Sequence, residues 1–335
     1  MNIRETMEQW ERQNLSPYAS LSSETLGRDR EEPLCDIRPA YQRDRDRILH
    51  SKSFRRLKDK TQVFLAPEGD HYRTRLTHTL EASQIARTIA KALRMNESLT
   101  EAIALGHDLG HTPFGHAGEY ILNEICEDGF AHYKQSVRVV EILEKKGQGL
   151  NLTKEVRDGM LNHRTSGNPA TMEGKIVRFS DKIAYINHDI DDAIRGKIIT
   201  ERDIPREYAD VLGDTVKDRL NIMIHDIINN SMDRPSIFMS PDVERAMRGL
   251  REWMFEHVYR NPAAKGEEGR AQQLIVTLYE YYLKHVDELP EEYLAMMELR
   301  GEKRERVVCD YIAGMSDGYA IDRFEELFVP KGWNV

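Results

Sequence analysis

Residues 172–195 read MEGKIVRFSDKIAYINHDIDDAIR and contain the longest helical pattern in the chain. Apolar side chains recur there in steps of three and four, the spacing that places them on one face of an α-helix. These positions are Ile176, Phe179, Ile183, Ile186, Ile190 and Ala193. The roughly opposite face carries Asp181, Tyr185, Asp189 and Asp192. A polar face is usually solvated, but solvated faces tend to mix Lys with Glu, so three aspartates and a tyrosine favour a ligand site.

The same spacing continues on both sides of this stretch. It predicts further helices over residues 80–93, 98–108, 137–147 and 241–257. Ser98 and Glu101 match a capping box for the second of these, whereas Lys145 and Lys146 suit the C-terminus of the third. Ser240 precedes a proline and is typical of a helix start. Alternating strand patterns are nearly absent, so the sequence predicts an all-α fold.

The chain divides only weakly into parts. We predict an N-terminal arm with a basic segment over residues 1–60, a core over 61–200 and a C-terminal helical extension over 201–335. The clearest loop is predicted at residues 261–269, where proline and glycine interrupt a charged stretch. Without a strong linker, we expect these parts to form one continuous body.

Composition excludes some classes of protein. The chain has 335 residues and a net charge of −9, which argues against a general nucleic-acid coat protein, because such a surface needs a basic excess. Three distant cysteines form no disulfide framework and fit a reducing cytoplasm. No signal peptide or membrane-spanning run is visible. The sequence therefore predicts a soluble cytoplasmic protein, with no membrane partner and no nucleic-acid partner indicated.

The densest chemistry lies in residues 106–119, GHDLGHTPFGHAGE. His107 and Asp108 offer an imidazole nitrogen and a carboxylate oxygen near the end of an apolar helix, and these donors suit divalent metal ions. Burying an unpaired carboxylate is costly, which weakens the alternative of a plain surface pair. Two ligands do not hold a metal alone, so His78 and Asp181 are the candidates for the others.

Histidines are concentrated in the same part of the chain. Eight of the 12 lie between residues 71 and 188: His71, His78, His107, His111, His116, His132, His163 and His188. A single histidine is most often a hydrogen-bonded core residue, but this density beside a metal doublet favours chemistry. If the helix continues past His107, His111 faces the same cavity, and Pro113 ends the helix.

The order of His78, His107-Asp108 and Asp181 is similar to the signature of the HD phosphohydrolase superfamily, in which four such side chains bind one divalent metal. Over roughly residues 15–320, the chain resembles the bacterial deoxyguanosinetriphosphate triphosphohydrolase-like proteins. Besides residues 106–119, the resemblance rests on QRDRDRILH (42–50), FRRL (54–57), KTQVF (60–64), RTRLTH (73–78) and DYIAGMSD (310–317).

The resemblance implies a helical HD-domain fold and hydrolysis of dGTP, or of several deoxynucleoside triphosphates, at the α-phosphate. The products are then a deoxynucleoside and tripolyphosphate. One divalent metal ion per subunit is implied, and Mn, Mg, Fe, Zn, Co and Ni all fit, since a set of two histidines and two aspartates accepts several metals. The implied metal ligands are His78, His107, Asp108 and Asp181.

The resemblance also implies the other site residues. Its catalytic set is His111, Glu119 and His132 as the acid–base group, with His116 on the α-phosphate. Its substrate-binding set is Arg75 and Lys182 on phosphates, Tyr185 beneath the sugar to discriminate against a 2′-hydroxyl, and Gln62 and Asp189 on the 3′-hydroxyl. It implies no role for Asp192, and His71, His163 and His188 stay unassigned.

Two further groups have competing interpretations. The basic run that includes Arg56 either contacts phosphate or forms a salt-bridged helix face. Tyr311 and Tyr319 either stack on a base or pack in the core.

Two alternative functions remain open. One is an HD phosphohydrolase for nucleoside monophosphates or cyclic nucleotides, and the other is a non-catalytic nucleotide-binding protein. The resemblance further implies a homo-oligomer and, in some members of the family, activation by a second nucleotide effector. Base preference does not follow from the sequence.

Overall fold

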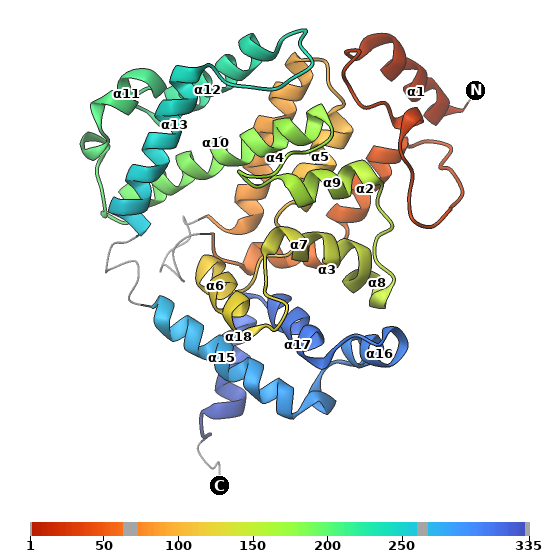
Figure 1. Ribbon diagram of the computed structural model, residues 1–335, viewed down its shortest axis with the longest axis vertical. Coiled ribbons are helices and arrows are strands. Elements are labelled where there is room, and N and C mark those ends of the chain that lie inside the picture. Colours follow the sequence, from red (N-terminus) through yellow and green to blue (C-terminus); the bar gives the residue numbers. More distant parts are fainter. Residues whose placement is uncertain (1, 63–72, 260–266, 332–335) are drawn as a thin grey trace.

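Helices make up the regular structure of the chain in the computed structural model, which describes residues 2–62, 73–259 and 267–331 (Figure 1). Within these ranges there is no β-strand, and a single bridge joins Thr61 to Thr74. The predicted all-α fold is confirmed. Among the described residues, none of the helices has the length and apolar character needed to cross a membrane.

The helices vary from single turns to the long central helix α10. The α-helices are α1 (Ile3–Asn14), α2 (Ala40–Leu49), α3 (Lys52–Arg56), α4 (Arg75–Ala92), α5 (Glu97–Gly106), α6 (Gly115–Ile125), α7 (His132–Arg138), α8 (Glu144–Gly147), α9 (Lys154–Asn162), α10 (Met172–Arg195), α11 (Arg206–Leu212), α12 (Val216–Ser231), α13 (Pro241–Met254), α15 (Glu268–Lys284), α16 (Glu291–Arg300), α17 (Arg304–Ala313) and α18 (Asp317–Phe328). The 3₁₀ turns are η1 (Ser22–Glu24), η2 (Leu57–Asp59), η4 (Glu201–Asp203) and η6 (Val286–Glu288), and the π-helical segments are η3 (Val139–Leu143) and η5 (Phe255–Tyr259).

Helix α10 has the predicted bounds and is buried on both of its faces. The hydroxyl of Thr171 caps its N-terminus by accepting a hydrogen bond from the backbone N–H of Gly174 at 3.0 Å. Its apolar stripe packs in the core, and Asp189 and Asp192 on the other face are each only 3% exposed. Helices α4, α5, α9 and α12 pack around it. The polar face therefore meets protein rather than bulk solvent.

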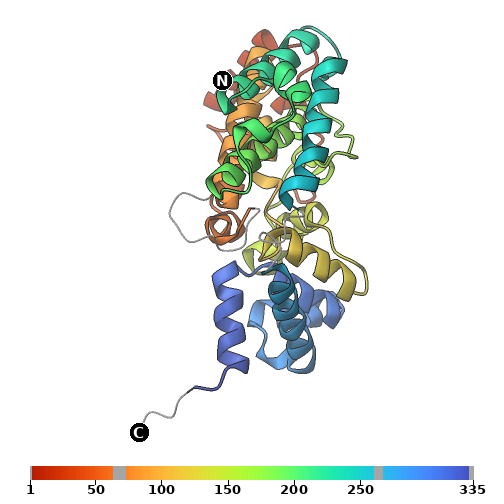
Figure 2. The ribbon, with the colours of Figure 1, turned by 90° about the vertical axis from the view of Figure 1, so that its left-hand side faces the viewer.

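Two hydrophobic cores organise the molecule. The first gathers buried residues from α2, α4, α5, α9, α10 and the helices up to η5, and it fills the upper part of Figure 1. The second joins Phe114 and Leu122, at and within α6, to helices α15–α18 below. Figure 2 shows α18 beside these helices, away from the first core. Helix α6 thus packs in the second core, although the helix before it in the chain, α5, packs in the first.

Three predicted helix details are wrong. Asn96, rather than Ser98, caps α5, because its side chain accepts from the backbone N–H groups of Ser98 and Leu99. The helix ends at Gly106, so His111 does not follow on a continuing helix. The helix predicted over residues 137–147 is not continuous: it passes through η3, and inside α8 the backbone becomes left-handed at Lys145 and Lys146, whose φ values are 52° and 56°.

Other predicted features are located as follows. Helix α13 begins at Pro241 with Ser240 as its N-cap, as predicted. The predicted loop 261–269 lies mostly outside the described residues, and its end, from Glu268, already belongs to α15. The division at residues 60 and 200 stays a prediction.

The N-terminal arm is anchored by buried carboxylates. Glu11 accepts hydrogen bonds from the backbone and hydroxyl of Ser22, at 2.7 and 2.8 Å. Glu173, at the start of α10, accepts from the backbone N–H groups of Ser20 and Asn96, both at 3.0 Å. Residues of the arm, of α5 and of α10 therefore share one buried acceptor.

We expect Ile176→Ala to lower the free energy of unfolding by about 2–5 kcal/mol, because Ile176 is 0% exposed and its truncation leaves a cavity. Urea denaturation followed by circular dichroism measures the change. Leu299→Ala is the control: Leu299 is 84% exposed, and its truncation should alter stability by less than about 0.5 kcal/mol. Equal losses in both variants would contradict the central place of α10.

Candidate functional site

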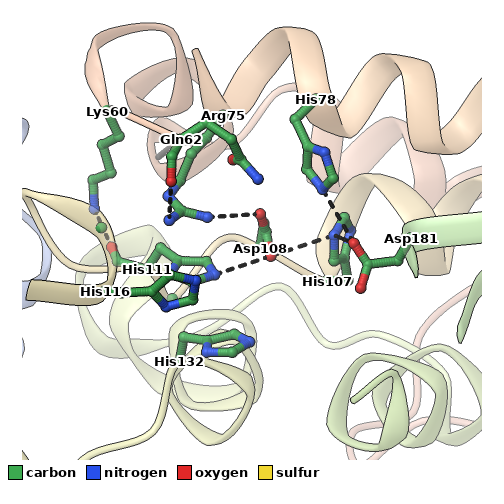
Figure 3. Close-up of polar contacts among 12 residues, drawn as sticks. Lys60, Gln62, Arg75, His78, His107, Asp108, His111, His116, His132 and Asp181 are labelled. Atoms are coloured by element: carbon green, nitrogen blue, oxygen red, sulfur yellow. Dashed lines mark hydrogen bonds and ion pairs between the residues drawn. The ribbon is translucent and has the colours of Figure 1, made fainter. Parts of the chain in front are cut away.

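Four predicted metal ligands meet where α4, α5 and α10 pack together (Figure 3). Nε2 of His78, on α4, lies 3.1 Å from Oδ1 of Asp181, on α10. Nε2 of His107 lies 3.3 Å from Oδ1 of Asp108 and 3.6 Å from Oδ1 of Asp181. The ligand atoms of His78, His107 and Asp108 all fall within 4.8 Å of one another, and all three residues are buried.

The hydrogen bonds of the two histidines suit a cation between them. Nδ1 of His107 donates to the carbonyl of Ala104 at 2.6 Å, so the buried Nε2, which has no hydrogen-bond partner among the described residues, is the ring nitrogen left to bind a proton or a metal ion. Nδ1 of His78 lies 3.3 Å from Nδ1 of His188, which leaves Nε2 of His78 to face Asp181. Without a proton or a metal ion, the Nε2 lone pairs of His78 and His107 would face carboxylate oxygens directly, and such an arrangement is unstable. The residues fit a divalent ion.

The titration properties of this group indicate the same need for positive charge. Burial by itself favours the neutral acids, yet His107 lowers the pKa values of Asp108 and Asp181 well below their usual range. Burial likewise favours a neutral His107, but Asp108 and Asp181 raise its pKa to about 9. In the metal-free protein, a proton on His107 thus neutralises part of the carboxylate charge.

A second cluster continues from Asp108. Nε2 of His111 lies 3.2 Å from Oδ1 of Asp108, and the ring of His111 stacks on that of His132 with centroids 4.0 Å apart. Glu119 accepts from both Nδ1 and the backbone N–H of His132, each at 2.8 Å. Asp108, His111 and His132 form a second group of ligand atoms within 4.8 Å, so the two clusters share the carboxylate of Asp108.

The surroundings of each group in this second cluster determine whether it is charged. Burial, together with Arg75 and His132, holds the pKa of His111 well below its usual range, so its ring is neutral. Burial alone would raise the pKa of Glu119, but hydrogen bonds from His116 and His132 lower it, so this carboxylate is ionised. His116, on α6, is different because its side chain is 79% exposed on the open side of the cluster.

The structure adds two histidines that the sequence left unassigned. His188 bridges from His78 to Glu81, whose Oε2 lies 2.7 Å from Nε2 of His188. Nε2 of His163 lies 3.3 Å from Nε2 of His132, and its ring is 5.0 Å from that of His107. Both are buried, and the excess of histidines was the only sequence signal for them. His71 lies outside the described residues.

The predicted substrate residues fall into two groups. Gln62 and Arg75 lie beside Asp108: Nη1 of Arg75 is 3.1 Å from Oδ2 of Asp108, and Nη2 donates to the carbonyl of Gln62 at 3.3 Å. Oε1 of Gln62 is buried and has no hydrogen-bond partner within the part of the chain that the structure describes. Arg75 therefore neutralises Asp108 in this structure, and its predicted phosphate contact requires sharing or moving the guanidinium.

The second group lies along α10. Tyr185 and Asp189 line one face, and the hydroxyl of Tyr259 donates to Oδ2 of Asp189. Among the described residues, the buried Tyr185 hydroxyl and Oδ1 of Asp189 have no hydrogen-bond partner, which leaves polar atoms available for a ligand. The guanidinium of Arg251 lies 5.8 Å from the Tyr185 ring centroid. Burial and the nearby Arg178 lower the pKa of Lys182, on the same helix.

Other predicted candidates lie apart from the metal cluster. Arg56 donates to the carbonyl of Gly314 at 3.0 Å, and Asp192 pairs with Arg73 at 3.0 Å. The hydroxyls of Tyr311 and Tyr319 lie 3.1 Å apart, with Tyr311 in the second core. Arg43, Arg45 and Arg47 of the basic run form ion pairs with acidic neighbours.

Comparisons with known proteins show which family the chain is similar to. A family model described as "HD domain" matches residues 75–186, and one described as "Phosphohydrolase-associated domain" matches residues 237–326. A protein of Caldanaerobacter subterraneus subsp. tengcongensis, named deoxyguanosinetriphosphate triphosphohydrolase-like protein, is 56% identical over 99% of this chain and 98% of its own length. Relatives of the same name from Clostridium perfringens and Desulfatibacillum aliphaticivorans are 48% and 47% identical, over 99% and 98% of this chain and 99% of each relative.

We expect His188→Ala to weaken divalent-metal binding by about 10- to 100-fold, because Nδ1–H of His78 then loses the partner that orients its ring. Metal titration against a chelating dye measures the affinity. His225→Ala is the control, since His225 is exposed on α12. Unchanged affinity in the His188 variant would refute the bridge from Glu81 to the metal centre.

The pH dependence of stability offers a test of Asp189. Burial raises the pKa of Asp189 to about 7, so the native state keeps a proton that the unfolded chain releases near pH 4. The folded state therefore loses stability from this group as the pH rises from about 4 to 7. We expect Asp189→Asn to remove the loss, and the variant to exceed the original protein by on the order of 2–4 kcal/mol at pH 8.

Thermal denaturation between pH 5 and 8, without substrate, measures this difference. Asp287→Asn serves as the control because Asp287 is exposed. A difference in Tm between the Asp189 variant and the original protein that does not grow with pH would show that Asp189 is ionised in the fold.

Proposed function

Because the chain belongs to the family of deoxyguanosinetriphosphate triphosphohydrolase-like proteins with an HD domain, we propose that it hydrolyses deoxynucleoside triphosphates to a deoxynucleoside and tripolyphosphate. The observation that carries the proposal is the carboxylate of Asp108, which joins a metal-binding cluster to a histidine–glutamate cluster. Hydrolysis of a phosphate ester needs a Lewis acid that polarises the phosphoryl group and side chains that transfer protons. Here the candidate metal site and the candidate proton-transfer group share Asp108.

In this proposal His78, His107, Asp108 and Asp181 hold one divalent ion, and the donor set accepts Mn, Mg, Fe, Zn, Co or Ni. When bound, such an ion polarises a phosphoryl oxygen and lowers the pKa of water. The chain's own contribution is to fix both histidine rings through their Nδ1 hydrogen bonds, so that Nε2 of each faces the carboxylates.

Attack at the α-phosphorus breaks the bond to the 5′-oxygen of the nucleoside, and this oxygen needs a proton as it leaves. His132 is suited to deliver it, because the ionised Glu119 accepts from Nδ1 and stabilises positive charge on the ring. His111 is neutral and lies between Asp108 and His132, where it orients both. The exposed His116 lies on the open side and contacts the α-phosphate in this scheme.

The same scheme assigns the substrate groups. Arg75 and Lys182 meet phosphate charge, Tyr185 lies beneath the sugar, and Gln62 with Asp189 binds the 3′-hydroxyl. The support is that Gln62, Tyr185 and Asp189 each have a buried polar atom with no partner in residues 2–62, 73–259 and 267–331, as expected for groups that bind a ligand. A 2′-hydroxyl would meet the Tyr185 ring, which favours deoxyribose.

The test is a product assay on metal-loaded protein with each deoxynucleoside triphosphate and GTP, alone and in pairs. Tripolyphosphate with deoxynucleoside is the expected product, and release of single phosphates would overturn the proposal. Nucleoside monophosphates and cyclic nucleotides in the same assay test the alternative function. The paired substrates test the nucleotide effector, and light scattering tests the homo-oligomer that the family resemblance implies.

We expect His132→Gln to lower kcat by about 10²- to 10⁴-fold while metal content stays at the original level, because the proton-moving ring is lost and the metal cluster is intact. Single-turnover assays and elemental analysis of the purified variant measure the two quantities. His257→Gln, on the exposed side of η5, should keep full activity. Full activity of the His132 variant would remove this residue from the acid–base scheme.

A further inference from the structure

The turn between α17 and α18, residues 313–317, is the end of the motif DYIAGMSD, for which the proposed function has no use. This turn lies against segments that carry site residues from the other end of the sequence. It receives side chains and backbone groups from residues 56–61 and from residue 114. Among the described residues, those of this turn make no hydrogen bond to the four candidate metal ligands, so any effect on the site must pass through these contacts.

Asp317 holds two separate segments with its two carboxylate oxygens. Oδ1 accepts from the backbone N–H of Phe114 at 2.9 Å, and Oδ2 accepts from the backbone N–H of Thr61 at 3.0 Å. Asp317 is only 9% exposed, so these are charge-assisted hydrogen bonds largely shielded from water. A neutral amide cannot accept both, because one of its two ends is a donor.

Lys60 makes the complementary contact with opposite polarity. Its buried ammonium donates to the carbonyl of His111 and, at 2.8 Å, to the carbonyl of Ala313 (Figure 3 shows Lys60 beside His111). One cation thus binds two carbonyls and one anion binds two N–H groups across the same junction. Both join the α17–α18 turn to residues 111–114.

The segments held in this way, at Thr61 and at Phe114, are next to candidate site residues. Phe114, the N-cap of α6, has a φ of 62°, and Gly115, its first residue, has a φ of 56°, so two successive residues are left-handed where the helix begins. That turn stands between His111 and the α6 residues His116 and Glu119. A Cβ on Gly115 would lie 3.3 Å from both the carbonyl oxygen of Gln62 and Nη2 of Arg75, so the two segments touch directly.

We propose that Asp317 is a positioning residue of the catalytic site: it fixes the left-handed turn at Phe114 against the Thr61–Gln62 segment, and Lys60 completes the junction. The C-terminal extension then determines how far the 3′-hydroxyl contact lies from the acid–base cluster. The kinetic consequence rests on the proposed function, whereas the hydrogen-bond junction does not.

The experiment compares full-length, metal-loaded Asp317→Asn with Asp322→Asn, an exposed position on the same helix that has the same change of charge. We expect Asp317→Asn to lower kcat per bound metal by about 10- to 100-fold with a smaller change in KM, since small misplacements of reacting groups are costly. Asp322→Asn should match the original protein. A purely structural role would reduce the folded, metal-loaded fraction and leave its kcat unchanged, which would overturn the proposal.

Amide hydrogen exchange provides a second measurement that does not depend on any activity. Exchange at Thr61 and Phe114 should accelerate at least about 10-fold in Asp317→Asn and not in Asp322→Asn. Unchanged exchange at both amides would overturn the junction itself, even if wild-type protein hydrolysed no triphosphate at all. If Asp317→Asn does not fold, Asp317→Glu keeps the charge, and the same loss of kcat and faster exchange are expected from its displaced carboxylate.

Discussion

A carboxylate removed from water needs donors or cations on both oxygens, and Asp108, at 3% exposure, meets this condition in two directions. Arg75 lies against Oδ2, while His107 and His111 lie against Oδ1. Because those partners come from α4, from the end of α5 and from the turn beyond it, one buried charge fixes the relative position of three segments. Removing any one of these partners would leave the buried carboxylate of Asp108 with too few donors or cations.

Helix α10 supplies the remaining constraint. Its apolar stripe holds it in the first core, and this packing directs Asp181, Tyr185 and Asp189 toward α4 and η5. A single helix therefore places a candidate metal ligand and two candidate sugar contacts at fixed intervals of about one turn. The spacing between these three candidate residues follows from helical geometry and does not depend on loop conformation.

Periodicity and residue chemistry predicted the fold class, the bounds of α10 and the candidate metal ligands that meet around Asp108, whereas Arg75, His132 and Glu119 were implied only by the family resemblance. What escaped prediction depends on partners distant in sequence. The end of α5 at Gly106 is stabilised by Ser136, whose hydroxyl donates to the carbonyl of His107 and accepts from the N–H of Gly110. His188 and His163 contact the site through His78 and His132, which lie 110 and 31 positions away in the sequence. No local sequence pattern marks such pairs.

The placement of α6 has a consequence for the modular description of this chain. The HD family model covers residues 75–186, yet α6 lies within that range and buries Leu122 in the core built by α15–α18. A fragment cut at those boundaries would keep every candidate metal ligand and would keep α6, with His116 and Glu119, but it would lose helices α15–α18, against which α6 packs. The segment that the HD family model matches is therefore smaller than the group of helices that supports the candidate site, since the helix carrying His116 and Glu119 packs on helices outside that segment.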